Sequence, residues 1–263
     1  MAATLCCDCC AATYEIRNQK IYFIEPLRSI DTLDGFKEII KRSTGNLLYR
    51  WIFPIVNPTF PFLYHRKVIE YIHDPDLFAV DLGSGNHRLD DRIIALDAVD
   101  YPAVDIVADL TALPFADNAI DVFASRSAIE HIHPIAVAVA EMDRATAPGG
   151  FGIHLIPLMY PYHSSIGDYQ RLTHMGAARL FDGWQLVEQR HVTGPFTLLL
   201  VVLIEVLSII FSFGAKKLKA ILYLLFCLVL FPIKFLDFPF LWFRSFVTVA
   251  PTILTVLKKP EKS

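Results

Sequence analysis

The stretch "AVDLGSGNHRLDDRIIALDAVD", residues 79–100, decides the fold of this chain. An apolar run ends at the turn Gly83-Ser84-Gly85, and a second apolar run begins at Arg92. Only residues 84–91 connect the two runs, whereas a crossover that contains a helix needs at least about ten residues. The sequence therefore predicts two strands joined through a glycine turn, without a full helix between them.

Short apolar segments and helical patterns alternate on both sides of this turn. The predicted strands cover 78–82, 92–96, 104–108, 120–125, 151–156 and 185–192, and predicted helices cover 134–146 and 174–181. Strands that are apolar throughout are buried on both faces, which is typical of parallel sheets covered by helices. Residues 76–194 are therefore predicted to form an α/β core, a Rossmann-like and mostly parallel sheet with flanking helices.

The glycine turn also limits the choice of cofactor. A dinucleotide site needs G-x-G-x-x-G at the start of a helix, because the pyrophosphate rests on the helix N-terminus. Here Arg88 stands at the position of the third glycine, so a nicotinamide dinucleotide is disfavoured. S-adenosylmethionine carries no phosphate, and its sulfonium gains nothing from a positive helix end. It needs close backbone approach, which Gly83 and Gly85 allow, and a carboxylate for its ribose, which Asp97 can supply.

Several motifs resemble those of class I S-adenosylmethionine-dependent methyltransferases of the type 11 kind. These are "FAVDLGSG", "IIALDAV", "DIVADLTALPFADNAIDVFASRSAIEHIHP" and "EMDRATAPGGFGIHLIP", and the resemblance covers about 76–190. It implies S-adenosylmethionine as cofactor and a set of cofactor-binding residues, namely Asp81, Gly83, Ser84, Gly85, Asp97, Asp109, Leu110 and Ser125. His87 departs from the family pattern, because a small residue is usual there.

A second stretch, "PYHSSIGDYQRLTHMGAARLF", resembles a bacterial subgroup with a shortened crossover after the glycine turn. That subgroup is often linked to glycan or lipid-linked sugar metabolism. The resemblance implies O- or N-methylation of a small-molecule, glycan or lipid-linked substrate.

Histidines at the predicted carboxyl edge of the sheet are candidates for acid–base chemistry. His131 and His163 are the predicted catalytic residues, because an oxygen nucleophile often needs a base near neutral pH. The alternative for Glu130 and His131 is that they cap the following helix. No metal site is predicted, because the pair His131-x-His133 has no evident third ligand.

The loop that follows the fifth core strand supplies candidate substrate contacts, which are Asp168, Tyr169 and Arg171. An equal alternative is that Asp168 and Arg171 form an ion pair that fixes the loop. His154 lies inside a predicted strand and is expected to be a core residue.

Residues 195–263 have a different composition from the core. The run 195–213 is apolar apart from Glu205 and would be about 27 Å long as a helix, close to the hydrocarbon thickness of a bilayer. A second run, 220–243, is interrupted by two prolines. We expect membrane-associating helices, since a domain already closed by its sheet has little surface left to cover them. Helices packed into a soluble core are the alternative.

The lysines between the two runs, Lys216, Lys217 and Lys219, bear on how these helices would meet a membrane. A spanning hairpin would place them on the side away from the α/β domain, against the positive-inside tendency. Helices that lie in the cytoplasmic leaflet avoid this conflict and are preferred.

The N-terminal region contains four of the five cysteines. Residues 1–25 resemble the front of a zinc ribbon, but the pairs Cys6/Cys9 and Cys7/Cys10 overlap and a second, separate pair is absent. We interpret the segment as a possible relic, with two short strands around Asn18 and Gln19; zinc binding and lipidation of the thiols stay open. Residues 26–75 are predicted to form a helical cover, with helices at 29–41, 46–53 and 62–72.

The composition of the chain bears on its binding partners and its cellular compartment. The net charge of −3 gives no basic footprint for nucleic acid, and neither a secretory signal nor a disulfide framework is evident, which favours the cytoplasm. The sequence predicts a methyltransferase at the cytoplasmic membrane surface. The alternatives are a non-catalytic scaffold with the same fold and, less favoured, a nicotinamide-dependent enzyme that modifies sugars.

Overall fold

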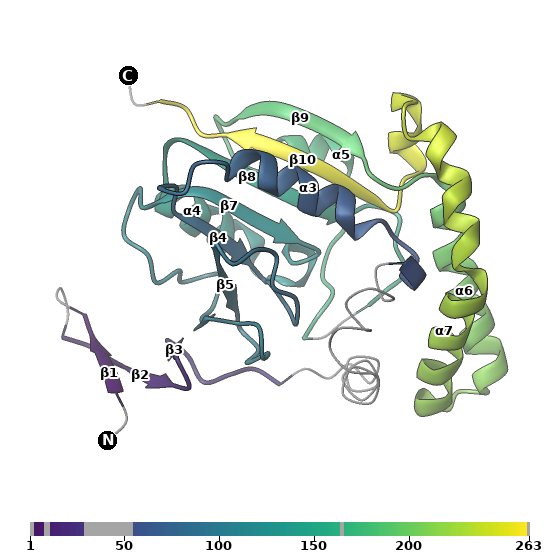
Figure 1. Cartoon of the computed structure of the whole chain (residues 1–263), viewed down its shortest axis with the longest axis horizontal. Helices are drawn as coiled ribbons and strands as arrows, with labels where there is room; N and C mark the ends of the chain where they lie inside the picture. Colours follow the sequence, from purple (N-terminus) through teal and green to yellow (C-terminus); the bar gives the residue numbers. More distant parts are fainter. Residues whose placement is uncertain (1–2, 8–10, 29–54, 164–165, 262–263) are drawn as a thin grey trace.

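The structure is a computed structural model that describes residues 3–7, 11–28, 55–163 and 166–261 (Figure 1). These residues contain a ten-stranded sheet in the order β1-β2-β3-β6-β5-β4-β7-β8-β10-β9. Five neighbouring strands of its centre run parallel: β6 (Ile106–Val107), β5 (Ile93–Asp97), β4 (Ala79–Leu82), β7 (Ile120–Arg126) and β8 (Thr146–Pro157). The predicted Rossmann-like α/β fold is confirmed.

Helices cover both faces of this sheet. On one face lies α3 (Pro61–Tyr71), whose Tyr64 and Val68 pack on Ile93 and Val122. On the other face lie α4 (Ile135–Ala145) and α5 (His174–Ala178). The helices predicted at 62–72 and 134–146 are confirmed, and α5 ends at residue 178 rather than 181. The connection from β4 to β5 contains turns and no helix, as its length predicts.

The N-terminal strands extend the sheet. They are β1 (Ala3–Cys6), β2 (Thr13–Arg17) and β3 (Lys20–Tyr22), and β3 pairs in parallel with β6. Asn18 and Gln19 form the turn between β2 and β3 with φ of 50° and 65°, which confirms the predicted strand pair. Cys9, Cys10 and the helices expected at 29–41 and 46–53 lie outside the described residues.

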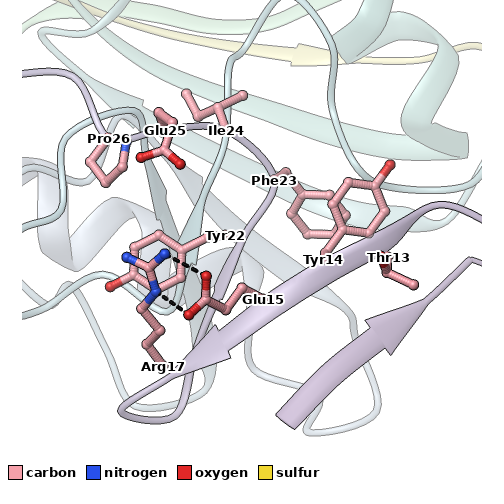
Figure 2. Close-up of a pocket in the computed structure, with 9 residues that line it drawn as sticks. All are labelled: Thr13, Tyr14, Glu15, Arg17, Tyr22, Phe23, Ile24, Glu25 and Pro26. Carbon is pink, nitrogen blue, oxygen red and sulfur yellow. Dashed lines mark hydrogen bonds and ion pairs between the residues drawn. The ribbon is translucent and has the colours of Figure 1, made fainter. Parts of the chain in front are cut away.

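A pocket opens beside this N-terminal hairpin, between β2 and the segment after β3 (Figure 2). The Arg17 guanidinium pairs with Glu15 and lies 5.3 Å from the centre of the Tyr22 ring. The pocket contains none of the site residues predicted from the sequence.

The end of the apolar region corrects an expectation. Helices were expected throughout 195–263, but Thr252–Lys258 forms β10, which lies antiparallel between β8 and β9 (Gln185–His191). The segment "TILTVLK" is rich in β-branched residues, which favour strands, and its side chains are almost all buried. The apolar helices are therefore an insertion between two neighbouring strands of the core.

This insertion begins with a helical hairpin, called here the apolar hairpin (residues 195–240). It consists of α6 (Pro195–Ser212), α7 (Lys216–Leu230) and the 3₁₀ segment η2 (Phe231–Phe240), and the 3₁₀ segment η3 (Arg244–Val249) follows it. The exposed Phe213 and Gly214 turn the chain with positive φ between α6 and α7. Figure 1 shows α6 and α7 side by side at one end of the molecule, the end toward which β7 points.

Charged residues hold the base of the apolar hairpin. The fully buried Asp237 accepts hydrogen bonds from the backbone N–H groups of Gly194, Phe196 and Thr197, each 2.9 Å long. A carboxylate in this position satisfies the unpaired N–H groups at the start of α6 and opposes its dipole. The ammonium of Lys234 donates to the carbonyl oxygen of Asn57 at 2.6 Å and so ties η2 to the segment before α3. Lys234 and Asp237, the two charged residues of the second apolar run, therefore both stabilise the fold.

By length and composition, Pro195–Ser212 and Lys216–Phe240 could each cross a membrane, although buried helices of soluble proteins meet the same test. In this protein much of the apolar hairpin faces outward. Leu199, Ile210 and Phe213 are 64%, 56% and 90% exposed.

Candidate active site

The glycine turn after β4 packs against the loop after β7. Gly83 has a φ of +69°, and a Cβ atom added there would lie 2.5 Å from the Cβ of Ala128. The backbone N–H of Gly83 donates to the carbonyl oxygen of Leu96 at 2.8 Å. The strand order reverses between β4 and β7, and ligands of open α/β sheets bind at the carboxyl edge of such a point. The turn therefore lies where this fold binds ligands.

Asp97 at the end of β5 is joined to the same turn. Its Oδ2 accepts the backbone N–H of Gly85 at 2.8 Å, and its Oδ1 accepts that of Val99 at 2.9 Å. Gly85 has a φ of +61°, and a Cβ atom there would meet no atom of the described residues within 4 Å. Each oxygen of Asp97 keeps a lone pair that can accept a ribose hydroxyl, and burial raises the pKa of this carboxyl.

Two further polar groups beside the turn are buried and lack a hydrogen-bond partner among the described residues, Asp81 Oδ1 and Ser84 Oγ. Burial raises the pKa of Asp81 to about 7, although the nearby Arg126 opposes the shift. Buried polar atoms normally have a partner, so atoms without one point to a missing ligand. With the open space beside Gly85 and the acid Asp97, these groups fit S-adenosylmethionine.

The remaining predicted cofactor residues differ in their settings. Asp109 is exposed and accepts the backbone N–H of Thr111 at 2.8 Å, whereas Leu110 is buried in the core. Ser125 is buried, and its hydroxyl lies 2.8 Å from Nδ1 of His154. Contact of Ser125 with the cofactor therefore rests on the resemblance alone.

His154 is the core residue that the sequence predicts. It is fully buried and stacks on Phe181 with ring centres 5.5 Å apart. Burial lowers its pKa to about 3, so the ring is neutral at physiological pH.

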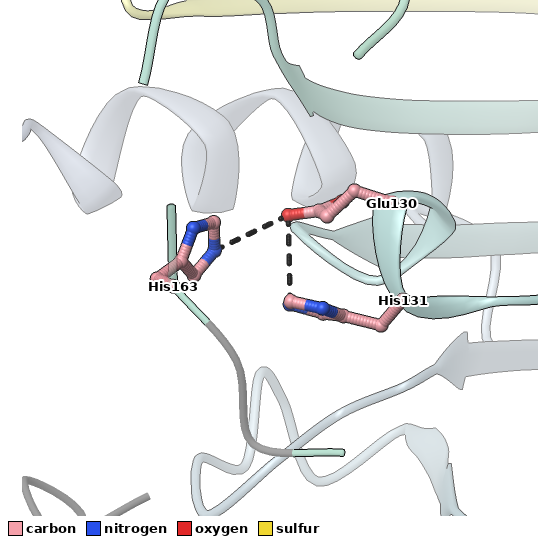
Figure 3. Close-up of side chains that lie close together, drawn as sticks. All are labelled: Glu130, His131 and His163. Atoms are coloured by element: carbon pink, nitrogen blue, oxygen red, sulfur yellow. Dashed lines mark ion pairs between the residues drawn. The ribbon is translucent and has the colours of Figure 1, made fainter. Parts of the chain in front are cut away.

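Glu130, His131 and His163 meet at the same edge of the sheet (Figure 3). Glu130 and His131 lie in the 3₁₀ turn η1 (Ile129–His131) after β7, and His163 lies in the loop after β8. Glu130 Oε1 is 3.5 Å from Nε2 of His163 and 3.8 Å from Nε2 of His131. The Glu130 side chain is 1% exposed, and neither of its oxygens accepts a hydrogen bond within the described part of the chain.

This arrangement differs from helix capping, the alternative that the sequence left open for Glu130 and His131. Pro134 is the N-cap of α4, and no side chain caps that helix. One sequence signal pointed to Glu130: it stands beside His131 just after the fourth core strand, at the predicted carboxyl edge of the sheet.

The loop after β8 is fixed by the pair Asp168–Arg171. The side chain of Asp168 is 3% exposed. It accepts hydrogen bonds from two guanidinium nitrogens of Arg171 and from the backbone N–H of His163, the last at 3.0 Å. Burial alone would raise the pKa of Asp168, but its bonds to Arg171 and His163 hold it below the usual value. The pair therefore positions His163, whereas Tyr169 is 58% exposed.

Tyr160 links this loop to the apolar hairpin. Its hydroxyl group interacts with that of Tyr223 of α7, and its ring centre is 5.1 Å from that of His163. Burial raises the pKa of Tyr160 to about 12. Sequence reasoning missed this residue, because nothing local indicates a partner in a distant helix.

Comparison with known proteins agrees with this architecture. Residues 72–153 match the family model described as "Methyltransferase domain". No curated protein matches the sequence.

Solved structures share the fold at low identity. One is a Burkholderia thailandensis 1,6-didemethyltoxoflavin-N1-methyltransferase with bound 1,6-didemethyltoxoflavin and S-adenosylhomocysteine, at 11% identity and a TM-score of 0.49, covering 99% of this chain and 100% of that chain. Another is the [4+2]-cyclase SpnF, at 16% identity and a TM-score of 0.47, covering 75% and 80%. The matched segment, residues 72–153, lies within the α/β core and contains the glycine turn, Asp97 and Glu130.

Proposed function

We propose that this protein methylates a hydroxyl or amino group of a glycan or lipid-linked molecule at a membrane surface. One observation carries the proposal: the apolar hairpin, with its outward-facing Leu, Ile and Phe side chains, contacts through Tyr223 the loop that presents His163. A substrate held at the membrane by a lipid tail would meet the site beside this hairpin.

The cofactor is proposed to bind between the glycine turn and Asp97. The backbone at Gly85 leaves room for the nucleoside, the Asp97 carboxylate accepts the ribose hydroxyls, and Asp109 with Leu110 contacts the adenine. The bound cofactor supplies a methyl group on a positively charged sulfur. Asp81 and Ser84, whose side-chain oxygens lack a partner among the described residues, form hydrogen bonds with polar groups of the same ligand.

The cluster at Glu130 lies where the acceptor must lose its proton. When the acceptor oxygen forms its bond to the methyl carbon, the carbon–sulfur bond breaks, and Nε2 of His163 takes the hydroxyl proton. His163 suits this role because its side chain is 33% exposed, whereas that of Glu130 is 1% exposed. The Glu130 carboxylate then stabilises the imidazolium. Tyr169 is proposed to contact the acceptor molecule.

The hairpin is proposed to lie along the membrane surface rather than to span the bilayer. Tyr223 is in the middle of α7 (Lys216–Leu230), and its side chain interacts with Tyr160 of the loop after β8. The midpoint of a spanning helix would lie about 15 Å inside the hydrocarbon, out of reach of that loop. A helix in the interface keeps this contact and places the exposed Lys216 and Lys217 among anionic headgroups.

Flotation with vesicles that contain anionic lipid tests the membrane part of the proposal. The triple variant Leu199→Glu/Ile210→Glu/Phe213→Glu changes only exposed side chains of the hairpin and is expected to remain folded but no longer float with the vesicles. The matched control is Met175→Glu/Val187→Glu, which changes exposed apolar residues elsewhere and is expected to float like wild type. Equal flotation of both variants would contradict membrane association.

Transfer of labelled methyl groups from S-adenosylmethionine to a lipid extract tests the catalytic part. We expect label in the lipid or lipid-linked glycan fraction with wild type, and none with Asp97→Ala. Label confined to water-soluble material would contradict the proposed substrate class.

A further inference from the structure

The two histidines of the site share an arrangement that acid–base chemistry does not require. Nδ1 of His131 is hydrogen-bonded to the carbonyl oxygen of Gly167, and Nδ1 of His163 lies 3.3 Å from the carbonyl oxygen of Pro161. A carbonyl oxygen can only accept, so each Nδ1 carries a hydrogen and donates it. In the neutral ring, each Nε2 then presents a lone pair.

These lone pairs face a carboxylate oxygen that also lacks a donor. Glu130 Oε1 lies 3.5 Å and 3.8 Å from the two Nε2 atoms, and the three ligand atoms lie within 4.8 Å of one another. Glu130 is almost completely buried, and a buried carboxylate is costly unless a positive charge compensates it. The nearby Arg171 is already paired with Asp168 through two guanidinium nitrogens.

We infer that Glu130, His131 and His163 bind a divalent zinc-type cation. Two His nitrogens and one carboxylate oxygen, with an open fourth position, form a ligand set typical of catalytic zinc. Ligand atoms about 2.1 Å from a tetrahedral ion lie about 3.4 Å from one another, close to the two separations from Glu130 Oε1.

The surroundings of the histidines support the same inference. Histidines that bind metals almost always donate their other ring N–H to a carbonyl or carboxylate, which fixes the tautomer and the ring orientation. Both rings have this feature here. Asp168, which accepts the backbone N–H of His163, additionally positions that ligand. The partly exposed His163 leaves one side of the site open.

The inference rests on the proposed function where it concerns the reaction. In the metal-bound protein, the cation would bind the acceptor hydroxyl and lower its pKa, so that the proton passes to water. The bound cation, rather than His163, would then activate the acceptor hydroxyl. The cofactor site beside Asp97 would be unaffected.

The test uses the full chain without an affinity tag, freed of metal with a chelator and titrated with zinc chloride in a calorimeter. The background carries Cys6→Ser/Cys7→Ser/Cys9→Ser/Cys10→Ser, so that the N-terminal thiols cannot contribute. We expect one zinc per chain and weaker manganese binding, as the usual affinity order of divalent ions predicts. Glu130→Gln should lower the affinity for zinc by more than about a hundredfold, because loss of a direct ligand exceeds the effect of changing an outer-shell partner.

A second variant and a spectrum complete the test. His133→Gln is the matched control, because His133 lies two residues from His131 but packs on Tyr169 outside the cluster; its zinc affinity should equal that of the background. Cobalt bound at the site should give a visible absorption band without thiolate charge transfer, and Glu130→Gln should abolish the band. Zinc binding that is absent, or equal in Glu130→Gln and the background, would overturn the inference.

Binding of S-adenosylhomocysteine to the metal-free protein separates this inference from the proposed function. Methyl transfer that persists at full rate in the chelator-treated protein would overturn the proposed role of the metal in the reaction and leave the methyltransferase proposal intact. Zinc binding by a protein that transfers no methyl group would overturn the proposed function alone.

Discussion

Tyr160, in the loop after β8, and Tyr223, in the middle of α7, interact through their hydroxyl groups. Through this pair the apolar hairpin contacts the loop that presents His163. An insertion that lies between two strands of the sheet thus contacts the loop of the proposed methyl-transfer site.

Removing the hydroxyl group of Tyr223 should loosen α7 without unfolding the core. We expect Tyr223→Phe to destabilise the docked hairpin by about 1 kcal/mol, the usual net value of a hydrogen bond, and to speed amide exchange in α7. Hydrogen–deuterium exchange measures this, with Tyr162→Phe as control because Tyr162 is 73% exposed in the same loop. Unchanged exchange in Tyr223→Phe would show that the bond does not hold the hairpin.

Alanine substitutions at Gly83 and Gly85 should have different effects: the first should mainly lower stability, and the second should mainly weaken cofactor binding. Gly83→Ala combines a positive φ with a contact 2.5 Å from Ala128, and we expect it to lower the free energy of unfolding by about 2–4 kcal/mol. Gly85→Ala meets only the φ penalty of about 1–2 kcal/mol, yet it should weaken cofactor binding because the new methyl group enters the open space.

Urea denaturation and binding of S-adenosylhomocysteine measure the two effects. The double variant Gly83→Ala/Ala128→Gly removes the clash and should recover part of the lost stability. If Gly83→Ala and Gly85→Ala proved equally stable, the close approach of the β4 turn to Ala128 would be refuted.

The buried Asp81 should make stability depend on pH. Its pKa is raised to about 7 in the folded protein and is about 3.9 in the unfolded chain. Between these values the folded state holds the extra proton, so the contribution of Asp81 to stability is complete below pH 4 and is lost as the pH rises through 7. The loss is at most about 1.4 kcal/mol per pH unit.

Asp81→Asn removes this titration while keeping the shape of the side chain. Denaturation of the ligand-free protein should show that the stability of the variant relative to wild type increases from pH 5 to pH 8. His154, whose pKa burial lowers to about 3, titrates with the opposite sign, but it is present in both proteins and cancels. A constant difference across this range would contradict a raised pKa for Asp81.

Two variants in the loop after β8 test whether Arg171 has a structural role and whether Tyr169 contacts the substrate. Arg171→Ala leaves the buried Asp168 without its partner, and we expect a loss of about 3–5 kcal/mol, as for other broken buried ion pairs. Tyr169→Ala should leave the melting temperature unchanged and raise KM for the methyl acceptor. The opposite pattern, a stable Arg171→Ala with a raised KM, would make Arg171 a substrate residue.

Much of the core could be predicted from the sequence, because its signals are local. Each of the six expected strands occurs, and the short connection after Gly83 correctly excludes a helix. Strand β10 was missed because "TILTVLK" follows a long apolar segment, where periodicity alone does not separate a buried strand from an apolar helix. Its partners β8 and β9 precede it by many residues, so only the folded chain shows the pairing.

The candidate site could be proposed only in part from the sequence, for the same reason. Asp97, His131 and His163 were identified from their places after strands, but no local pattern joins Glu130 to His163 or Tyr160 to Tyr223. Such contacts depend on how two loops of different strands meet. The ion pair of Asp168 and Arg171 was one of two readings that the sequence could not separate, and burial of Asp168 favours it.

Calorimetric titration of the full-length, detergent-solubilised protein with S-adenosylhomocysteine tests the central claim most directly. Asp100→Ala, which changes an acid outside the site, is the control for Asp97→Ala, and NAD is the control ligand. We predict micromolar binding to wild type and Asp100→Ala, loss of binding in Asp97→Ala, and no binding of NAD. A folded wild-type protein that binds no S-adenosylhomocysteine would contradict the account and leave a methyltransferase fold that serves as a scaffold.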